Sequence, residues 1–160
     1  DIEKDNSGQR IEDLKRDGRV HRLGVEAEIH IGHKIMLESG IDYARAEFDG
    51  RSNRYNGYQG GLSVAKMWDS FMLHLSVEGG LNAFDASHPI FDKIREDKVY
   101  EAIGFLSWLN PLGYQNSYLN VGGGYEKNDS NIAFYDSEAS FMFMTVGYQF
   151  GAGGIDDDDD

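Results

Sequence analysis

The sequence has 160 residues, of which 40% are hydrophobic and 27% are charged, enough for one folded domain and too apolar for a wholly disordered chain. It contains no cysteine, which excludes disulfide scaffolds, thiolate metal sites and thiol catalysis. A formal net charge of −13 argues against nucleic acid as a partner, and the absence of any long apolar run excludes membrane-spanning helices.

Apolar and polar residues alternate along most of the chain. In the first alternating segment Leu23 and Val25 would point to one side of an extended strand, and Glu26 to the other. This period of two recurs and predicts an all-β fold, an antiparallel up-and-down meander of about seven strands. The predicted strands span residues 22–31, 35–44, 58–66, 71–82, 99–109, 116–126 and 142–150.

The predicted connections alternate in length. They are short at residues 32–34, 68–70 and 110–113, and long at residues 48–56, 84–97 and 127–138. Short turns at one end and long loops at the other are typical of outer-membrane β-barrels, which also carry an aromatic girdle at each end. The girdle expected at the short-turn end consists of Trp68, Phe71, Trp108, Tyr114, Tyr148 and Phe150. The outer girdle is expected from Tyr43, Phe48, Tyr55, Tyr58, Phe84 and Tyr100.

These patterns predict a β-barrel of the outer membrane of a Gram-negative bacterium, in contact with outer-membrane lipid. Its polar face would line the lumen, with Glu26, Glu28, Glu38, Asp42, His74, Glu78, Glu101 and Glu126 as candidates. Such a lumen would favour cations, unless its carboxylates are simply hydrated and balanced by basic neighbours. Alternation alone leaves two other hypotheses open, a small passive pore or structural barrel, and a soluble β-barrel that binds an apolar ligand inside.

We expect residues 1–20 to form an exposed loop or N-terminal extension, residues 21–150 the barrel, and residues 151–160 an acidic tail that is either an addition or a native solvated segment. Complete bacterial barrels have an even number of strands. Seven strands, the last ending on the periplasmic side, would leave the N-terminal segment outside the cell. The count therefore predicts the C-terminal part of a larger barrel, which associates with missing strands or with other copies of the same barrel, or else a soluble design or fragment to which the counting rule does not apply.

Residues 128–136 read Asn-Asp-Ser-Asn-Ile-Ala-Phe-Tyr-Asp and lead into a final strand that ends with Gly147-Tyr148-Gln149-Phe150. This C-terminal segment resembles the corresponding end of proteins of the surface lipoprotein assembly modifier family. The resemblance implies a non-enzymatic passage or assembly role in moving a client lipoprotein to the cell surface. It also implies that the barrel-assembly machinery reads the final strand, with Val146, Tyr148 and Phe150 as the assembly-signal candidates.

No catalytic residue, cofactor site or metal site is expected. His74, Ser76 and Glu78 follow one another at every second position of a strand, so their side chains would point in parallel and would not converge on one reacting atom. Ser130 followed by Asn131 is similar to a motif of outer-membrane lipases, but Asn128 stands where the activating base would be.

Overall fold

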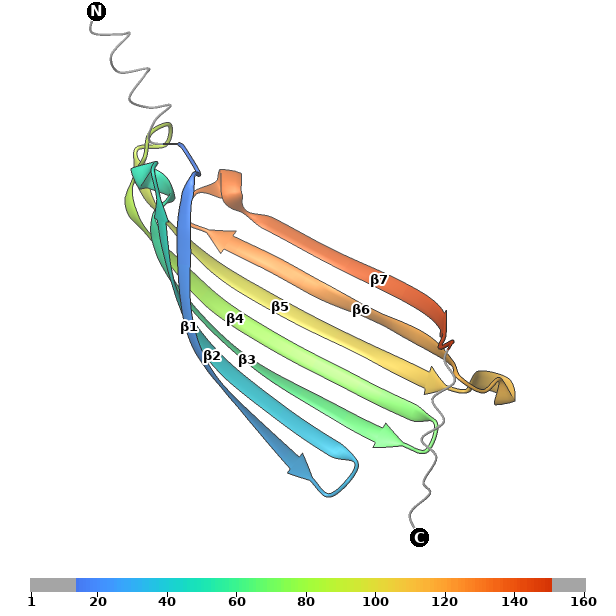
Figure 1. Cartoon of the computed structure of the whole chain (residues 1–160). Coiled ribbons are helices and arrows are strands. Elements are labelled where there is room, and N and C mark those ends of the chain that lie inside the picture. Colours follow the sequence, from blue (N-terminus) through green and yellow to red (C-terminus); the bar gives the residue numbers. More distant parts are fainter. Residues whose placement is uncertain (1–13, 151–160) are drawn as a thin grey trace, which may run out of the picture.

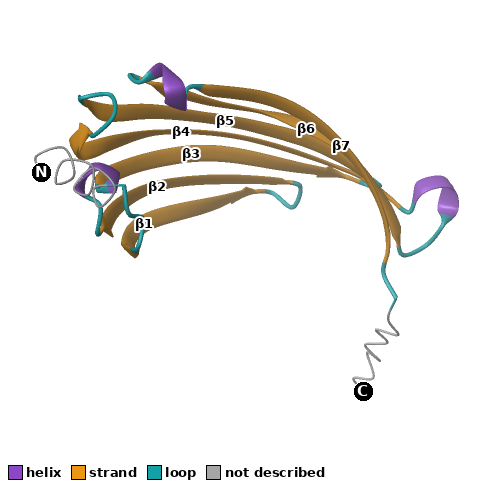
Figure 2. Cartoon of the chain, turned by 90° about the horizontal axis from the view of Figure 1, so that it is seen from above, coloured by secondary structure: helices purple, strands orange, loops and turns teal. Residues whose placement is uncertain are grey.

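Each strand of the protein pairs with its neighbours in the sequence, and the result is one curved sheet (Figures 1 and 2). The computed structural model describes residues 14–150, in which seven antiparallel strands follow one another in chain order. This confirms the predicted all-β meander. The strands are β1 (Gly18–Ile31), β2 (Ile35–Phe48), β3 (Tyr55–Trp68), β4 (Phe71–His88), β5 (Lys93–Leu109), β6 (Ser117–Ser130) and β7 (Ser137–Tyr148).

The register between strands keeps side chains of one kind on one face. Val25 lies opposite Ile41, and Ile41 lies opposite Gly60, so an apolar row crosses the first three strands. Three positions along β1 from Val25, Glu28 lies opposite Glu38 on the other side of the sheet. A shift of one residue in any pairing would exchange the two sets of side chains. We call these two sides the apolar face and the polar face.

The polar face is the concave side of the curved sheet. Six strand residues are buried, namely Ala46, Gly57, His88, Asp97, Ser107 and Ser130, and the register places all six on the polar face. Side chains on the concave side of a curved sheet converge and shield one another, whereas those on the convex side spread apart. The apolar face is therefore convex and open.

Little of the chain forms a closed hydrophobic core. Ala46 and Ile132 are the only buried hydrophobic residues between residues 14 and 150, and no large side chain in that range is fully buried. On the convex face Val25 is 70% exposed and Met144 is 71% exposed. Folded proteins rarely leave so large a continuous apolar surface uncovered, so this face needs a partner or an apolar solvent.

Several predicted boundaries were wrong, because the strands are longer than the alternation suggested. β1 begins at Gly18, inside the predicted extension 1–20. β4 continues to His88 and β5 begins at Lys93, so the predicted loop 84–97 shrinks to residues 89–92. Polar residues can continue a strand wherever both faces meet water. The acidic tail at residues 151–160 and most of the predicted extension lie outside the described residues.

The connections at the two ends of the sheet also differ less in length than predicted. Residues 49–54, 89–92 and 131–136 connect strands at one end, and residues 32–34, 69–70 and 110–116 at the other. Three one-turn 3-10 helices lie in the connections of residues 14–150: η1 (Arg51–Asn53), η2 (Pro111–Gly113) and η3 (Ala133–Tyr135). We call the end with η1 and η3, toward which Tyr43 and Tyr58 lie, the tyrosine end. The opposite end, where Trp68 and Trp108 lie, is the tryptophan end.

Candidate functional site

Two rows of aromatic side chains border the apolar face. At the tyrosine end Tyr43 and Tyr58 lie directly opposite each other with ring centroids 5.3 Å apart, and Tyr100 and Tyr125 continue on the same face. At the tryptophan end Trp68, Phe71 and Trp108 lie in one register row. The rings of Phe71 and Trp108 stack at 5.7 Å.

Half of the predicted outer girdle was wrong. Phe48, Tyr55 and Phe84 lie on the polar face, because the register aligns Tyr55 with the buried Ala46 on one side and with Phe84 on the other. Tyr55 and Phe84 pack together at 5.3 Å there. Tyr125, which the alternation assigns to the apolar face, was missing from the predicted girdle.

The polar face carries an acidic hollow across β1 to β4. It measures about 460 Å³, and its polar lining includes Glu26, Glu38, Asp42, Gln59, Ser63, Ser76 and Glu78. The amide Nε2 of Gln59 donates a 2.6 Å hydrogen bond to Oε2 of Glu78. A Cβ atom on Gly24 would lie 2.0 Å from Oδ1 of Asp42, so this glycine makes room for the carboxylate.

A second group of carboxylates continues the acidic surface across the sheet. Glu78, Glu101 and Glu126 lie directly opposite one another on β4, β5 and β6. Directly opposed side chains have Cβ atoms about 5 Å apart, and like charges at that spacing repel. Glu101, a predicted lumen residue, is one of two polar residues in the predicted strand 99–109. The row needs water or cations beside it.

The remaining predicted lumen residues occupy different surroundings. Glu28 lies beside Glu26 on the polar side of β1, where His30 Nδ1 is 3.2 Å from Glu28 Oε1. His74 stacks on Phe105 at 4.9 Å, and Phe105 lies 6.4 Å from Phe143. The concave face is thus acidic from β1 to β6 and also carries aromatic side chains on β5 and β7.

A compact cluster of side chains holds the tyrosine end together. Arg95 lies over the rings of Phe84 and Tyr135, at 4.6 and 3.5 Å, and forms an ion pair with Asp97, which is 2% exposed. His88 is also buried. The backbone N–H of Ile90 donates to its Nδ1, so Nε2 carries the proton that it donates to the Tyr135 hydroxyl, 2.9 Å away.

The segment at residues 128–136 braces this same end. The amide of Asn131 donates to the carbonyl of Ile94, and its oxygen accepts from the N–H of Glu96. The carboxylate of Asp136 accepts from the N–H of Ser130 at 2.7 Å. The residues that carry the resemblance to the lipoprotein assembly family therefore fasten the β6–β7 connection to β5. The Ser130 hydroxyl accepts from the N–H of Ile132.

The assembly-signal candidates lie at the edge of the sheet. Val146 and Tyr148 belong to the apolar face of β7, and both are exposed. Phe150 follows the strand and packs against Tyr148 at 4.6 Å.

Within residues 14–150 the structure contains no helix long and apolar enough to cross a membrane. In the same part of the chain no group of three or more His, Asp or Glu side chains is arranged to hold a metal ion.

The fold and the two faces define an all-β protein, one antiparallel meander sheet with an apolar convex side and an acidic concave side. The chain belongs to the family described as protein of unknown function (DUF2860), whose model matches residues 1–149. The comparisons found no curated protein and no solved structure that matches the chain.

Proposed function

We propose that the sheet is part of the wall of an outer-membrane β-barrel, with its convex face against lipid and its acidic concave face along an aqueous passage. The observation that carries this proposal is the separation of apolar and acidic side chains onto opposite faces between two aromatic rows, with Lys66 beside Trp68 as a charged exception on the apolar face. Transmembrane barrels have the same arrangement, an apolar outward band bordered by aromatic girdles around a polar interior.

The spacing of the aromatic rows supports a membrane-spanning band. Tyr58 and Trp68 stand at the two ends of the band on β3, ten residues apart. At about 3.3 Å per residue this is about 33 Å along the strand. A tilt of about 40° reduces the height to about 25 Å, which equals the apolar band of transmembrane barrels.

Strand direction limits how such a wall can close. The sheet is open in the part that the structure describes, because β1 pairs only with β2 and β7 only with β6. Since the strands alternate in direction, β1 and β7 run parallel. If β1 paired with β7 of the same sheet, or with β7 of a copy in the same membrane orientation, the two strands would be parallel. Bacterial barrels are antiparallel throughout. Closure therefore needs an odd number of further strands.

The negative charge of the concave face favours the passage of hydrated cations. Its carboxylates outnumber its basic side chains, of which Arg22 lines a second hollow of about 400 Å³ next to the first. Rings of Asp and Glu give cation selectivity in pores. Movement of a client lipoprotein, and recognition of Val146, Tyr148 and Phe150 by the barrel-assembly machinery, stay predictions from the resemblance.

The test is fractionation of a Gram-negative host that produces the natural protein, followed by gel migration of the detergent-extracted protein with and without boiling. We expect recovery in the outer membrane, extraction only by detergent, and a heat-dependent shift of the band. Recovery in solution without detergent would overturn the proposal, because the convex face would then be covered by something other than lipid.

A further inference from the structure

A pair of glycines interrupts the apolar face over β3 and β4. Gly60 on β3 and Gly79 on β4 lie directly opposite each other, in the register row between Ile41 and Tyr100. Neither has a positive φ angle. A Cβ atom on Gly60 would have its nearest neighbours at 3.5 Å, and one on Gly79 at 3.9 Å, so ordinary side chains would fit. Local packing therefore does not explain these glycines.

The missing side chains leave an open apolar trough over β1 to β4. Its volume is about 630 Å³, within the usual range of ligand sites, about 300 to 1,000 Å³. Side chains around it include Leu23, Val25, Ile41, Tyr43, Tyr58 and Leu81. Because the trough is open on the convex face and extends across neighbouring strands, it suits a flexible chain that lies along the sheet.

The end of the trough nearest the tyrosine row is polar. The row next to the glycines contains Tyr43, Tyr58, Leu81 and Lys98 in register. The Tyr43 hydroxyl donates a 2.8 Å hydrogen bond to Asn56, which fixes the ring at the rim. Lys98 is exposed beside Leu81, with Asp129 opposite it on β6. An apolar trough therefore leads to an exposed ammonium group and tyrosine hydroxyls.

We propose that this trough binds one acyl chain of a phosphate-bearing membrane lipid, in the leaflet at the tyrosine end. The chain lies over Gly60 and Gly79, and the phosphate is met by the ammonium group of Lys98. An amphipathic ligand fits better than a second copy of the sheet, because the apolar floor of the trough leads to a polar rim that carries the exposed ammonium group of Lys98 and tyrosine hydroxyls. This inference rests on the proposed membrane location.

The experiment is native mass spectrometry of the folded, detergent-extracted natural protein, titrated with phosphatidylglycerol and, separately, with phosphatidylcholine of the same acyl chains. We expect one retained phosphatidylglycerol and weaker retention of the zwitterionic lipid. Gly79→Leu should fill the trough and weaken retention about tenfold, the loss expected when about two methylene groups are no longer buried. Lys98→Gln should remove the preference for phosphatidylglycerol.

Val121→Leu is the matched control, because it enlarges a side chain on the same face outside the trough and should change nothing. Equal retention by wild type and Gly79→Leu, or no retained lipid on a protein that is membrane-inserted and heat-modifiable, would overturn the lipid site alone. A protein that needs no detergent would overturn the proposed function as well.

Discussion

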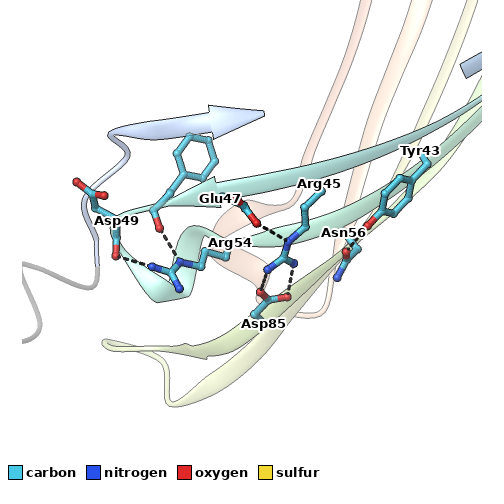
Figure 3. A network of polar contacts seen from close by, with 8 residues as sticks. Tyr43, Arg45, Glu47, Asp49, Arg54, Asn56 and Asp85 are labelled. Carbon is cyan, nitrogen blue, oxygen red and sulfur yellow. Dashed lines mark hydrogen bonds and ion pairs between the residues drawn. The ribbon is translucent and has the colours of Figure 1, made fainter. Parts of the chain in front are cut away.

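The guanidinium group of Arg45 on β2 binds the carboxylate of Asp85 on β4 through two hydrogen bonds of 2.9 and 2.6 Å (Figure 3). The pair lies beyond the tyrosine row, where the strands have left the proposed membrane band. Nearby, Arg54 donates from Nε to the carbonyl of Phe48. Together these contacts fasten the connection between β2 and β3 to β4.

Asp85→Asn should lower the free energy of unfolding by about 0.5 to 1 kcal/mol at pH 7, as expected for a partly exposed ion pair. The hydrogen bonds from Arg45 lower the pKa of Asp85. The ion pair's contribution is thus complete above the ordinary pKa of aspartate, about 3.9, and disappears as the pH falls through the lower folded-state pKa. Urea unfolding in lipid vesicles should show this difference at pH 7 and its loss in strong acid. Asp92→Asn, which removes an exposed carboxylate, is the control. Equal effects of the two variants would show that the ion pair with Arg45 does not stabilise the fold.

The alternation of residues sufficed to predict the meander and the side of the sheet on which the lumen candidates lie. It failed where both faces are polar, as in the continuation of β4 to His88. It also failed for Phe48, Tyr55 and Phe84, because the strands continue through these residues without a break and each lies an odd number of positions from the apolar residues of its own strand. Contacts such as Arg45 with Asp85, 40 residues apart, depend on that register and have no signal in a single sequence.

Acidification should loosen the tyrosine end through His88. Burial, and to a lesser extent the charge of Arg95, lowers the pKa of His88 below its ordinary value of 6.5. The unfolded state therefore binds the proton more readily, and stability falls as the pH drops from about 6.5 toward the lower folded-state pKa. Protonation also removes the acceptor at Nδ1 that holds the Ile90 N–H.

Hydrogen exchange of residues 88–92, corrected for the intrinsic effect of pH, should be faster at pH 5 than at pH 7.5. His88→Gln should remove most of this pH dependence, whereas His33→Gln, at the opposite end of the sheet, should leave it intact. The same pH dependence in the His88→Gln protein would show that another group is responsible.

Arg95→Met should be among the most damaging single substitutions at this end. It removes the partner of Asp97, which is 2% exposed, and breaking a buried ion pair from one side costs about 3 to 5 kcal/mol. The ring contacts with Phe84 and Tyr135 are lost as well. Adding Asp97→Asn should recover part of the stability, because no uncompensated buried charge remains. Chemical unfolding of the single and double variants measures this, and a double variant less stable than Arg95→Met would contradict the ion-pair account.

Glu101→Gln should stabilise the sheet. Glu101 is the middle member of the row formed with Glu78 and Glu126, so its neutralisation removes two repulsive cross-strand pairs, each worth about 0.2 to 1 kcal/mol. The gain should shrink at high salt, because added ions screen the repulsion that wild type experiences. Glu138→Gln serves as the control, since Glu138 lies opposite Lys127 and its loss should not stabilise the sheet.

Replacing Glu78, Glu101 and Glu126 together with glutamine should lower the cation-to-anion permeability ratio in planar bilayers, because these carboxylates attract cations into the proposed passage. An unchanged ratio in a conducting triple variant would remove these carboxylates from the selectivity mechanism.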